Sequence, residues 1–98
     1  MEYRIAWLPR AEKRFDEIIN YIKANWSENN AKNFVQYTNQ TINLILLNPL
    51  LFQESSKKGI REALITKHNL LIYKVKKDEI QLLTFFDNRQ NPKKKFRL

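Results

Sequence analysis

The sequence predicts an α+β fold in which a helical hairpin packs against a mainly antiparallel sheet of about four strands. Three observations lead to this class. An alternating stretch opens the chain, two segments with helical apolar spacing fill residues 9–47, and three apolar runs with short polar breaks lie within residues 61–95. Because helices and later strands are segregated along the chain, α+β is favoured over alternating parallel units.

Length and composition fit one small globular domain. The 98 residues can bury a modest core, and 43% apolar residues with one Gly and three Pro give no sign of a linker. The absence of Cys excludes a disulfide framework, a thiolate zinc site and a cysteine nucleophile, and it fits a reducing cytoplasm. The N-terminus does not resemble a signal peptide, and the most apolar stretch, residues 42–52, contains Asn43, Asn48 and Pro49. Neither export nor a membrane span is therefore expected.

Positive charge is the strongest compositional signal. The formal net charge is +8 and the sequence pI is near 9.9, which predicts attraction to nucleic acid, an acidic protein or an anionic membrane surface without choosing among them. A solvated, Lys-rich surface is the plain alternative. Twelve of the 18 basic residues lie in the C-terminal half: Lys57, Lys58, Arg61, Lys67, Lys74, Lys76, Lys77, Arg89, Lys93, Lys94, Lys95 and Arg97. Most of the positive electrostatic potential should therefore lie at one end of the molecule. Residues 89–98 form a basic tail.

The N-terminal half predicts one strand and two helices. Tyr3, Ile5 and Trp7 alternate along a short strand that should join the later sheet. The first helix runs over about residues 9–25. The second starts after the capping residue Ser27 and ends near residue 47 because a proline follows at position 49. The two apolar stripes are Ala11, Phe15, Ile18, Ile19 and Ile22, and then Ala31, Phe34, Val35, Thr38, Ile42, Ile45 and Leu46. A connection of a few residues makes the helices an antiparallel hairpin.

A three-strand meander follows. Strands are predicted over residues 62–66, 70–75 and 80–86, because the breaks at residues 67–69 and 76–78 have hairpin length. Alternation assigns Leu71, Tyr73 and Val75 to one face, Ile80, Leu82, Thr84 and Phe86 to one face of the next strand, and Leu70, Ile72, Leu83 and Phe85 to the other faces. The strands at residues 70–75 and 80–86 are expected at the centre of the sheet. Gly59, the only glycine, should supply a positive φ just before the first of the three strands.

Five segments form a recognisable pattern in this order. They are the A-x3-F-x2-I-I-x2-I helix at residues 11–22, the helix end Asn48-Pro49, Gly59-Ile60-Arg61, the strand LIYKV at residues 71–75, and FDNRQNP at residues 86–92. Together with the order of strand, helical hairpin, polar loop, meander and basic tail, they resemble the toxins of the RelE/ParE superfamily of bacterial type II toxin–antitoxin systems. The resemblance spans nearly the whole chain and implies a toxin that a cognate antitoxin neutralises.

The superfamily contains two mechanisms. Ribonuclease members act on messenger RNA in the ribosome through basic residues and often a Tyr, His or Glu that moves protons, whereas ParE-like members poison DNA gyrase by binding. Arg89 matches an arginine at the end of the ribonucleases' last strand, and Arg61 matches a basic residue where their meander begins. Leu70 stands where they carry a further arginine, and Lys95 or Phe96 where they carry a C-terminal tyrosine. The resemblance therefore favours a ParE-like function, with the endonuclease as the alternative.

The candidate site residues follow from this comparison. The candidates for catalysis are Arg89, His68, Lys67 and Arg61, and those for binding a target or the antitoxin are Arg61, Arg89, Lys93, Lys94 and Lys95. His68 and Arg89 should be neighbours, since the turn at residues 67–69 and the end of the last strand share a sheet edge. Arg61 lies roughly 17 Å along its strand from that turn and should contact the antitoxin or order the preceding loop. The structural alternatives are a surface histidine and a salt bridge from Arg89 to Asp87 or Asp16.

Three functions are thus kept: a ParE-like toxin, a ribosome-dependent messenger RNA endonuclease, and a non-toxic basic nucleic-acid-binding module. The expected partners are an antitoxin and either DNA gyrase or the ribosome with its messenger RNA, within a possible toxin–antitoxin hetero-oligomer. No membrane, metal or cofactor is implied. The C-terminal part of the antitoxin should be acidic and disordered alone, and should dock beside the helical hairpin or add a strand to a sheet edge. Tyr73 is expected in the core.

Overall fold

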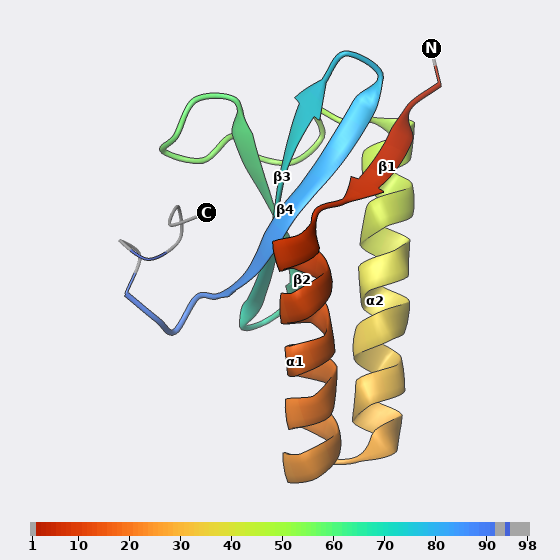
Figure 1. Ribbon diagram of the computed structural model, residues 1–98, viewed down its shortest axis with the longest axis vertical. Helices are drawn as coiled ribbons and strands as arrows, with labels where there is room; N and C mark the ends of the chain where they lie inside the picture. Colours follow the sequence, from red (N-terminus) through yellow and green to blue (C-terminus); the bar gives the residue numbers. More distant parts are fainter. Residues whose placement is uncertain (1, 92–93, 95–98) are drawn as a thin grey trace.

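The computed structural model describes residues 2–91 and 94. In this part of the chain the elements follow in the order β1 (Arg4–Trp7), α1 (Pro9–Asn25), α2 (Glu28–Leu47), β2 (Ile60–Thr66), β3 (Asn69–Lys76) and β4 (Glu79–Asp87). The predicted α+β class is confirmed, and both helices have the predicted bounds (Figure 1). β2 begins two residues earlier than predicted because Ile60 already pairs with Lys74 of β3.

The sheet has four strands in the order β1-β4-β3-β2. β2 pairs antiparallel with β3, and β3 pairs antiparallel with β4. The N-terminal strand β1 runs parallel to β4, with Ile5 beside Ile80 and Trp7 beside Leu82. The sheet is therefore mainly antiparallel, as predicted, and β1 and β2 form its two edges.

Both helices lie on one face of the sheet (Figure 1). α1 starts at Pro9, where the missing N–H leaves no helical hydrogen bond unmade. α2 starts after Ser27, whose hydroxyl accepts a hydrogen bond from the Asn30 N–H at 3.0 Å. Neither helix in the described residues is long and apolar enough to cross a membrane.

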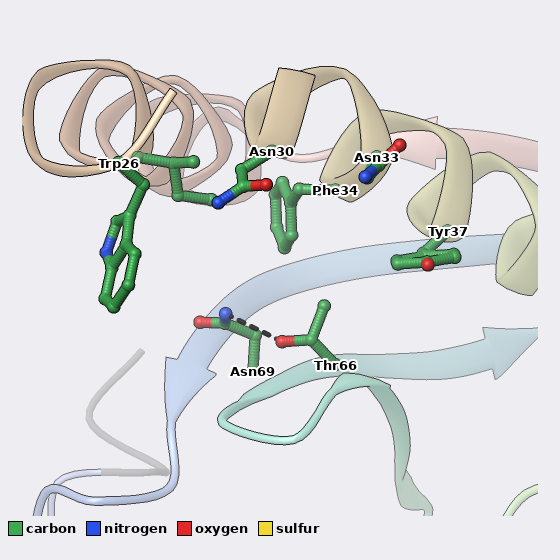
Figure 2. A pocket seen from close by; sticks show the side chains of 8 residues that line it. Trp26, Asn30, Asn33, Phe34, Tyr37, Thr66 and Asn69 are labelled. Carbon is green, nitrogen blue, oxygen red and sulfur yellow. Dashed lines mark hydrogen bonds between the residues drawn. The ribbon is translucent and has the colours of Figure 1, made fainter. Parts of the chain in front are cut away.

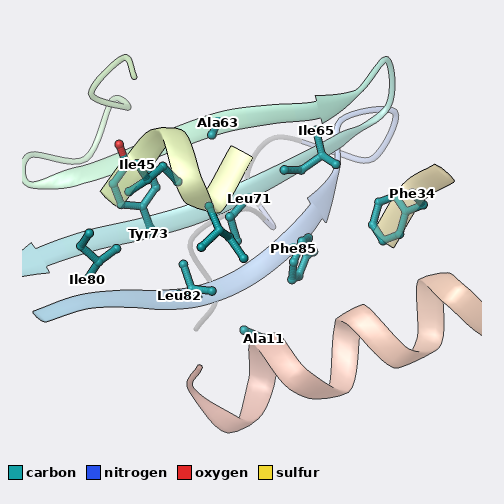
Figure 3. Packing of buried hydrophobic residues seen from close by; sticks show 11 residues of the cluster. Ala11, Phe34, Ile45, Ala63, Ile65, Leu71, Tyr73, Ile80, Leu82 and Phe85 are labelled. Carbon is teal, nitrogen blue, oxygen red and sulfur yellow. The ribbon is translucent and has the colours of Figure 1, made fainter. Parts of the chain in front are cut away.

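The main core fills the space between the helices and the sheet (Figure 3). Both predicted helical stripes contribute to it, from Ala11 on α1 to Ile45 on α2. Phe85 lies among three aromatic rings, with centroid distances of 6.0 Å to Trp7, 5.4 Å to Phe15 and 6.3 Å to Phe34. These rings join both helices and β1 to the central strand β4.

The predicted alternation is wrong at the end of β4. The register shifts between Ile72 and Tyr73, which leaves Leu83 as an extra residue opposite them. Such a bulge exchanges the faces of the residues that follow it. Phe85 therefore faces the helices, whereas Phe86 joins a smaller apolar cluster on the opposite face. The bulge is what brings Phe85 into the aromatic group.

Candidate functional site

Two segments far apart in the sequence meet at one end of the sheet. They are the β2–β3 turn, which contains Lys67 and His68, and the end of β4. Asn88 joins them, because its N–H donates to the His68 carbonyl at 2.9 Å and its side-chain amide donates to the Lys67 carbonyl at 3.3 Å. The structure places His68 and Arg89 at the same edge, as the hairpin topology predicted. We call Lys67, His68 and Arg89 the basic edge.

Arg89 is held by Asp87. The Arg89 N–H donates to Asp87 Oδ1 at 2.9 Å, Nε donates to Oδ1 at 3.0 Å and Oδ2 at 3.2 Å, and Nη2 donates to Oδ2 at 2.6 Å. These side-chain bonds lower the pKa of Asp87 and raise the pKa of Arg89. The salt bridge named above as a structural alternative is thus formed. The Arg89 side chain is nevertheless 59% exposed, so its outer side remains open to a ligand.

His68 is partly buried beside this ion pair. Its carbonyl accepts from Asn88, and a positive charge on its ring adds to the lowering of the Asp87 pKa. It is the only histidine of the chain. At the basic edge, within the described residues, it is the one side chain whose type ordinarily exchanges protons near neutral pH.

Sequence reasoning missed Tyr21 at this end of the molecule. An electrostatic interaction with Tyr21 raises the pKa of Arg89 further, after the larger effects of Asp87, which places Tyr21 of α1 near the basic edge. The signal was present in the sequence. Tyr21 lies off the apolar stripe of α1 and is 57% exposed, so it is an aromatic residue on the polar face of an amphipathic helix.

Arg61 lies elsewhere. Its Nη1 donates to the Phe52 carbonyl at 2.8 Å, and its backbone forms an isolated bridge with Glu54. The same loop is closed at Gly59, which has the predicted positive φ of 82° and donates its N–H to Glu54 Oε2 at 3.0 Å. Arg61 thus orders the loop that precedes β2, one of the two roles that the sequence suggested, and it does not join the basic edge.

Tyr73 is a core residue, as expected. Its side chain is completely buried, and its hydroxyl donates to the Pro49 carbonyl at 2.8 Å. Burial raises the pKa of Tyr73, although the nearby Arg61 acts in the opposite direction. The phenol is therefore a protonated donor at neutral pH, out of reach of a ligand in solution.

The basic tail is only partly described. Lys94 is exposed and donates its N–H to the Asn91 carbonyl at 2.9 Å. Lys93 and Lys95 lie outside the described residues. Within residues 2–91 and 94, no group of three or more His, Cys, Asp or Glu side chains could hold a metal ion.

The basic edge holds a guanidinium in a fixed orientation beside a histidine. A rigid guanidinium with an open side binds phosphate or carboxylate. Attack of a ribose hydroxyl on a phosphate needs a base and an acid in place. The described residues bring His68 to this edge but leave Tyr73 in the core.

Comparison with known families gives one match over most of the chain. Residues 5–92 match the family described as the ParE toxin of the type II toxin–antitoxin system parDE. Among curated proteins, no sequence matches this chain.

Several solved structures share the fold. A chain of the chromosomal ParDE system from P. aeruginosa has a TM-score of 0.75 at 19% identity, over 88% of this chain and 96% of that chain. The YoeB dimer from Staphylococcus aureus gives 0.61 at 20% identity, over 88% and 97%. The E. coli DinJ–YafQ complex gives 0.61 at 14% identity, over 91% and 96%. At these identities the likeness shows a common fold.

Proposed function

Because the chain belongs to the family of ParE toxins of type II toxin–antitoxin systems, we propose that it stops growth by binding DNA gyrase and that a cognate antitoxin neutralises it. It would then act in the cytoplasm, where that target works. The protein acts as a binder rather than as a nuclease. Its basic edge supplies one contact to an anionic group of the target.

The pairing of Arg89 with Asp87 carries this proposal. A guanidinium already neutralised by a carboxylate is a weaker stabiliser of a pentacoordinate phosphate than a free one. The same pairing fixes the side chain for recognition, since it lowers the freedom that binding would otherwise remove. Tyr73 is completely buried and donates to the Pro49 carbonyl, so its hydroxyl is not placed to relay protons between His68 and RNA.

A ribosome-dependent messenger RNA endonuclease is the second candidate. One observation favours it, namely that His68 and Arg89 share the sheet edge. A histidine beside an arginine is the minimum for moving a proton and holding a phosphate.

Induced expression without antitoxin separates these functions. The gyrase hypothesis expects growth arrest, loss of plasmid supercoiling and a DNA damage response while messages stay intact. Cleaved transcripts with normal supercoiling would establish the nuclease instead. Unimpaired growth at matched soluble expression would remove the toxin function altogether.

Arg89→Ala tests the basic edge within this proposal. We expect a large loss of toxicity with unfolding free energy changed by less than about 1 kcal/mol, because the side chain lies outside the core. Neutralising Lys93, Lys94 and Lys95 together serves as the comparison and should weaken toxicity gradually, mainly at low salt, because salt screens the same charges in the parent protein. If the Arg89→Ala protein is fully toxic, Arg89 is not part of the site. If the variant misfolds, Arg89 has a structural role instead.

The antitoxin has a suitable docking surface at the end of α2 and in the turn after it. No charged residue occurs from position 33 to position 53, although 29% of the chain is charged. Four exposed leucines crowd this stretch, Leu44, Leu47, Leu50 and Leu51, and we call them the leucine surface. Exposed apolar patches of this kind mark protein interfaces. An amphipathic antitoxin segment would bury its apolar face here, which agrees with docking beside the helical hairpin.

Within the described residues, β1 is the more open of the two sheet edges at which the antitoxin could add a strand. The outer edge of β2 is partly occupied, because Ser55 N–H donates to the Ile60 carbonyl at 2.7 Å and Glu62 N–H donates to the Gln53 carbonyl at 3.1 Å. β1 at the other end of the sheet pairs on one side with β4.

Leu47→Ser should weaken antitoxin binding without destabilising the fold. Titration at increasing salt would show constant affinity if burial alone drives the complex, and that result would exclude electrostatic steering.

A further inference from the structure

A groove lies where the connection between α1 and α2 passes over the ends of β2 and β3. It has a volume of about 350 Å³ and is open to solvent. Its lining includes Trp26, Asn30, Phe34, Tyr37, Thr66 and Asn69 (Figure 2). The first four come from the helical side and the last two from the strands. We call it the hairpin groove.

Exposed aromatic side chains gather at this end of the molecule. Trp26 is 71% exposed and Tyr37 is 47% exposed, and Tyr21 near the basic edge is the third. Among the described residues, these are the large aromatic side chains classed as exposed, and the other exposed large apolar residues are leucines. Aromatic side chains have large apolar areas, so an aromatic ring left in water forgoes more stabilisation by burial than a smaller side chain does. Rings left exposed around a groove offer flat apolar faces to a planar ligand.

Amide groups supply the polar part of the groove. Asn30 and Asn33 line it from α2, and Asn69 lines it from β3, where its Nδ2 donates to Thr66 Oγ1 at 3.1 Å. An amide both donates and accepts hydrogen bonds, as the edges of nucleobases do. Among the residues that the structure describes, those that line the groove are uncharged.

Positive charge lies immediately outside the groove. Asn69 follows Lys67 and His68 in the β2–β3 turn, and Asn69 pairs with Asp87, which holds Arg89. Neutral aromatic and amide groups thus adjoin a cationic rim in a chain of net charge +8. A ligand with flat neutral groups on an anionic backbone complements both parts.

We propose that the hairpin groove binds single-stranded nucleic acid, with unpaired bases stacked on Trp26 and Tyr37 and phosphates against the basic edge. Duplexes are disfavoured because their bases are already stacked and their edges paired. Binding is tolerant of sequence and sensitive to salt. This site is additional to the gyrase hypothesis and does not rest on it.

An acidic peptide fits the groove less well. It would be drawn to the same basic edge, but a peptide anchored by apolar side chains is better served by the leucine surface, which lies at the end of α2 and in the turn after it. Planar bases use the aromatic faces and the amides together.

Fluorescence anisotropy with labelled oligonucleotides tests the proposal. The 98-residue chain is titrated with a twelve-nucleotide single-stranded DNA, with RNA of the same sequence, and with the DNA duplex, at two salt concentrations. Trp26→Ala and Tyr37→Ala should each raise the Kd for a single strand roughly tenfold, since stacking on an aromatic ring contributes about 1–3 kcal/mol per base. Leu64→Ala is the control, because Leu64 is 54% exposed and lies on the face of β2 opposite to Ala63 and Ile65, outside the groove lining, and it should change the Kd less than about twofold.

The competing explanations give different results. A higher affinity for DNA or for RNA shows which sugar the groove prefers, and either preference supports the proposal. Heparin carries negative charge without bases, so if it competes as well as the oligonucleotide and the aromatic variants bind normally, the contact is electrostatic only and the proposal fails. It also fails if oligonucleotides do not bind while the same variants lose affinity for an acidic antitoxin peptide. Gyrase inhibition by the variants is measured separately, so each hypothesis can fail alone.

Discussion

Replacing Tyr73 by Phe removes one oxygen atom from a side chain that is completely buried in the main core. The ring keeps its packing, and the hydrogen bond of 2.8 Å to the Pro49 carbonyl is lost. This bond joins β3 to the turn after α2, across 24 positions of sequence. The variant therefore isolates a single long-range polar contact.

The size of the stability loss in Tyr73→Phe follows from the burial of the hydrogen-bond acceptor. Pro49 is itself buried, so its carbonyl would lose this partner without gaining easy access to water. Leaving a buried acceptor unsatisfied costs about 1–3 kcal/mol. For a domain of this size, a loss of about 2 kcal/mol lowers Tm by roughly 8–16 °C.

Urea unfolding followed by circular dichroism measures the effect, with Tyr37→Phe as the matched control. Tyr37 is half-exposed, so loss of its hydroxyl should change the unfolding free energy by less than about 0.5 kcal/mol. Tyr73→Phe should keep its toxicity at a temperature where it is folded. Equal stability of the two variants would refute the argument from burial, and a stable but non-toxic Tyr73→Phe protein would move Tyr73 from the core into the functional site.

Three further predictions concern the ion pair, a turn and the core. Folding lowers the pKa of Asp87, so the Asp87 carboxylate stabilises the fold above the unfolded pKa of about 4, and this stability is lost as pH falls through the folded pKa. Asp87→Asn should therefore be less stable than the parent at pH 7 and equally stable in acid. A difference in urea unfolding that does not change with pH would contradict this. Lys77 has a φ of 58°, so Lys77→Gly should stabilise by up to about 1 kcal/mol, whereas Lys76→Gly in the adjoining strand should destabilise by a similar amount. Phe85→Ala should cost about 3–5 kcal/mol in thermal unfolding, because it empties the centre of the aromatic group; a loss below about 1 kcal/mol would show that the neighbouring rings refill the space.

Local signals in the sequence determined the elements. The starts of both helices follow from a proline and a serine within the first turn, and the end of α2 follows from Pro49. Gly59 takes the conformation that only glycine adopts without strain. Each of these effects acts within a few residues, so the sequence alone was sufficient.

The faces of β4 and the surroundings of the candidate site required the tertiary structure. Simple alternation could not reveal the bulge opposite Ile72, because a register shift depends on how the paired strand packs beneath the helices. The sequence offered Asp87 and Asp16 as partners of Arg89, and the geometry at the end of β4 chose Asp87. Trp26 and Asn69 are far apart in the chain and line one groove because the helical hairpin is laid over the strand ends. Contacts of this kind are fixed by packing between distant segments, which residue spacing does not encode.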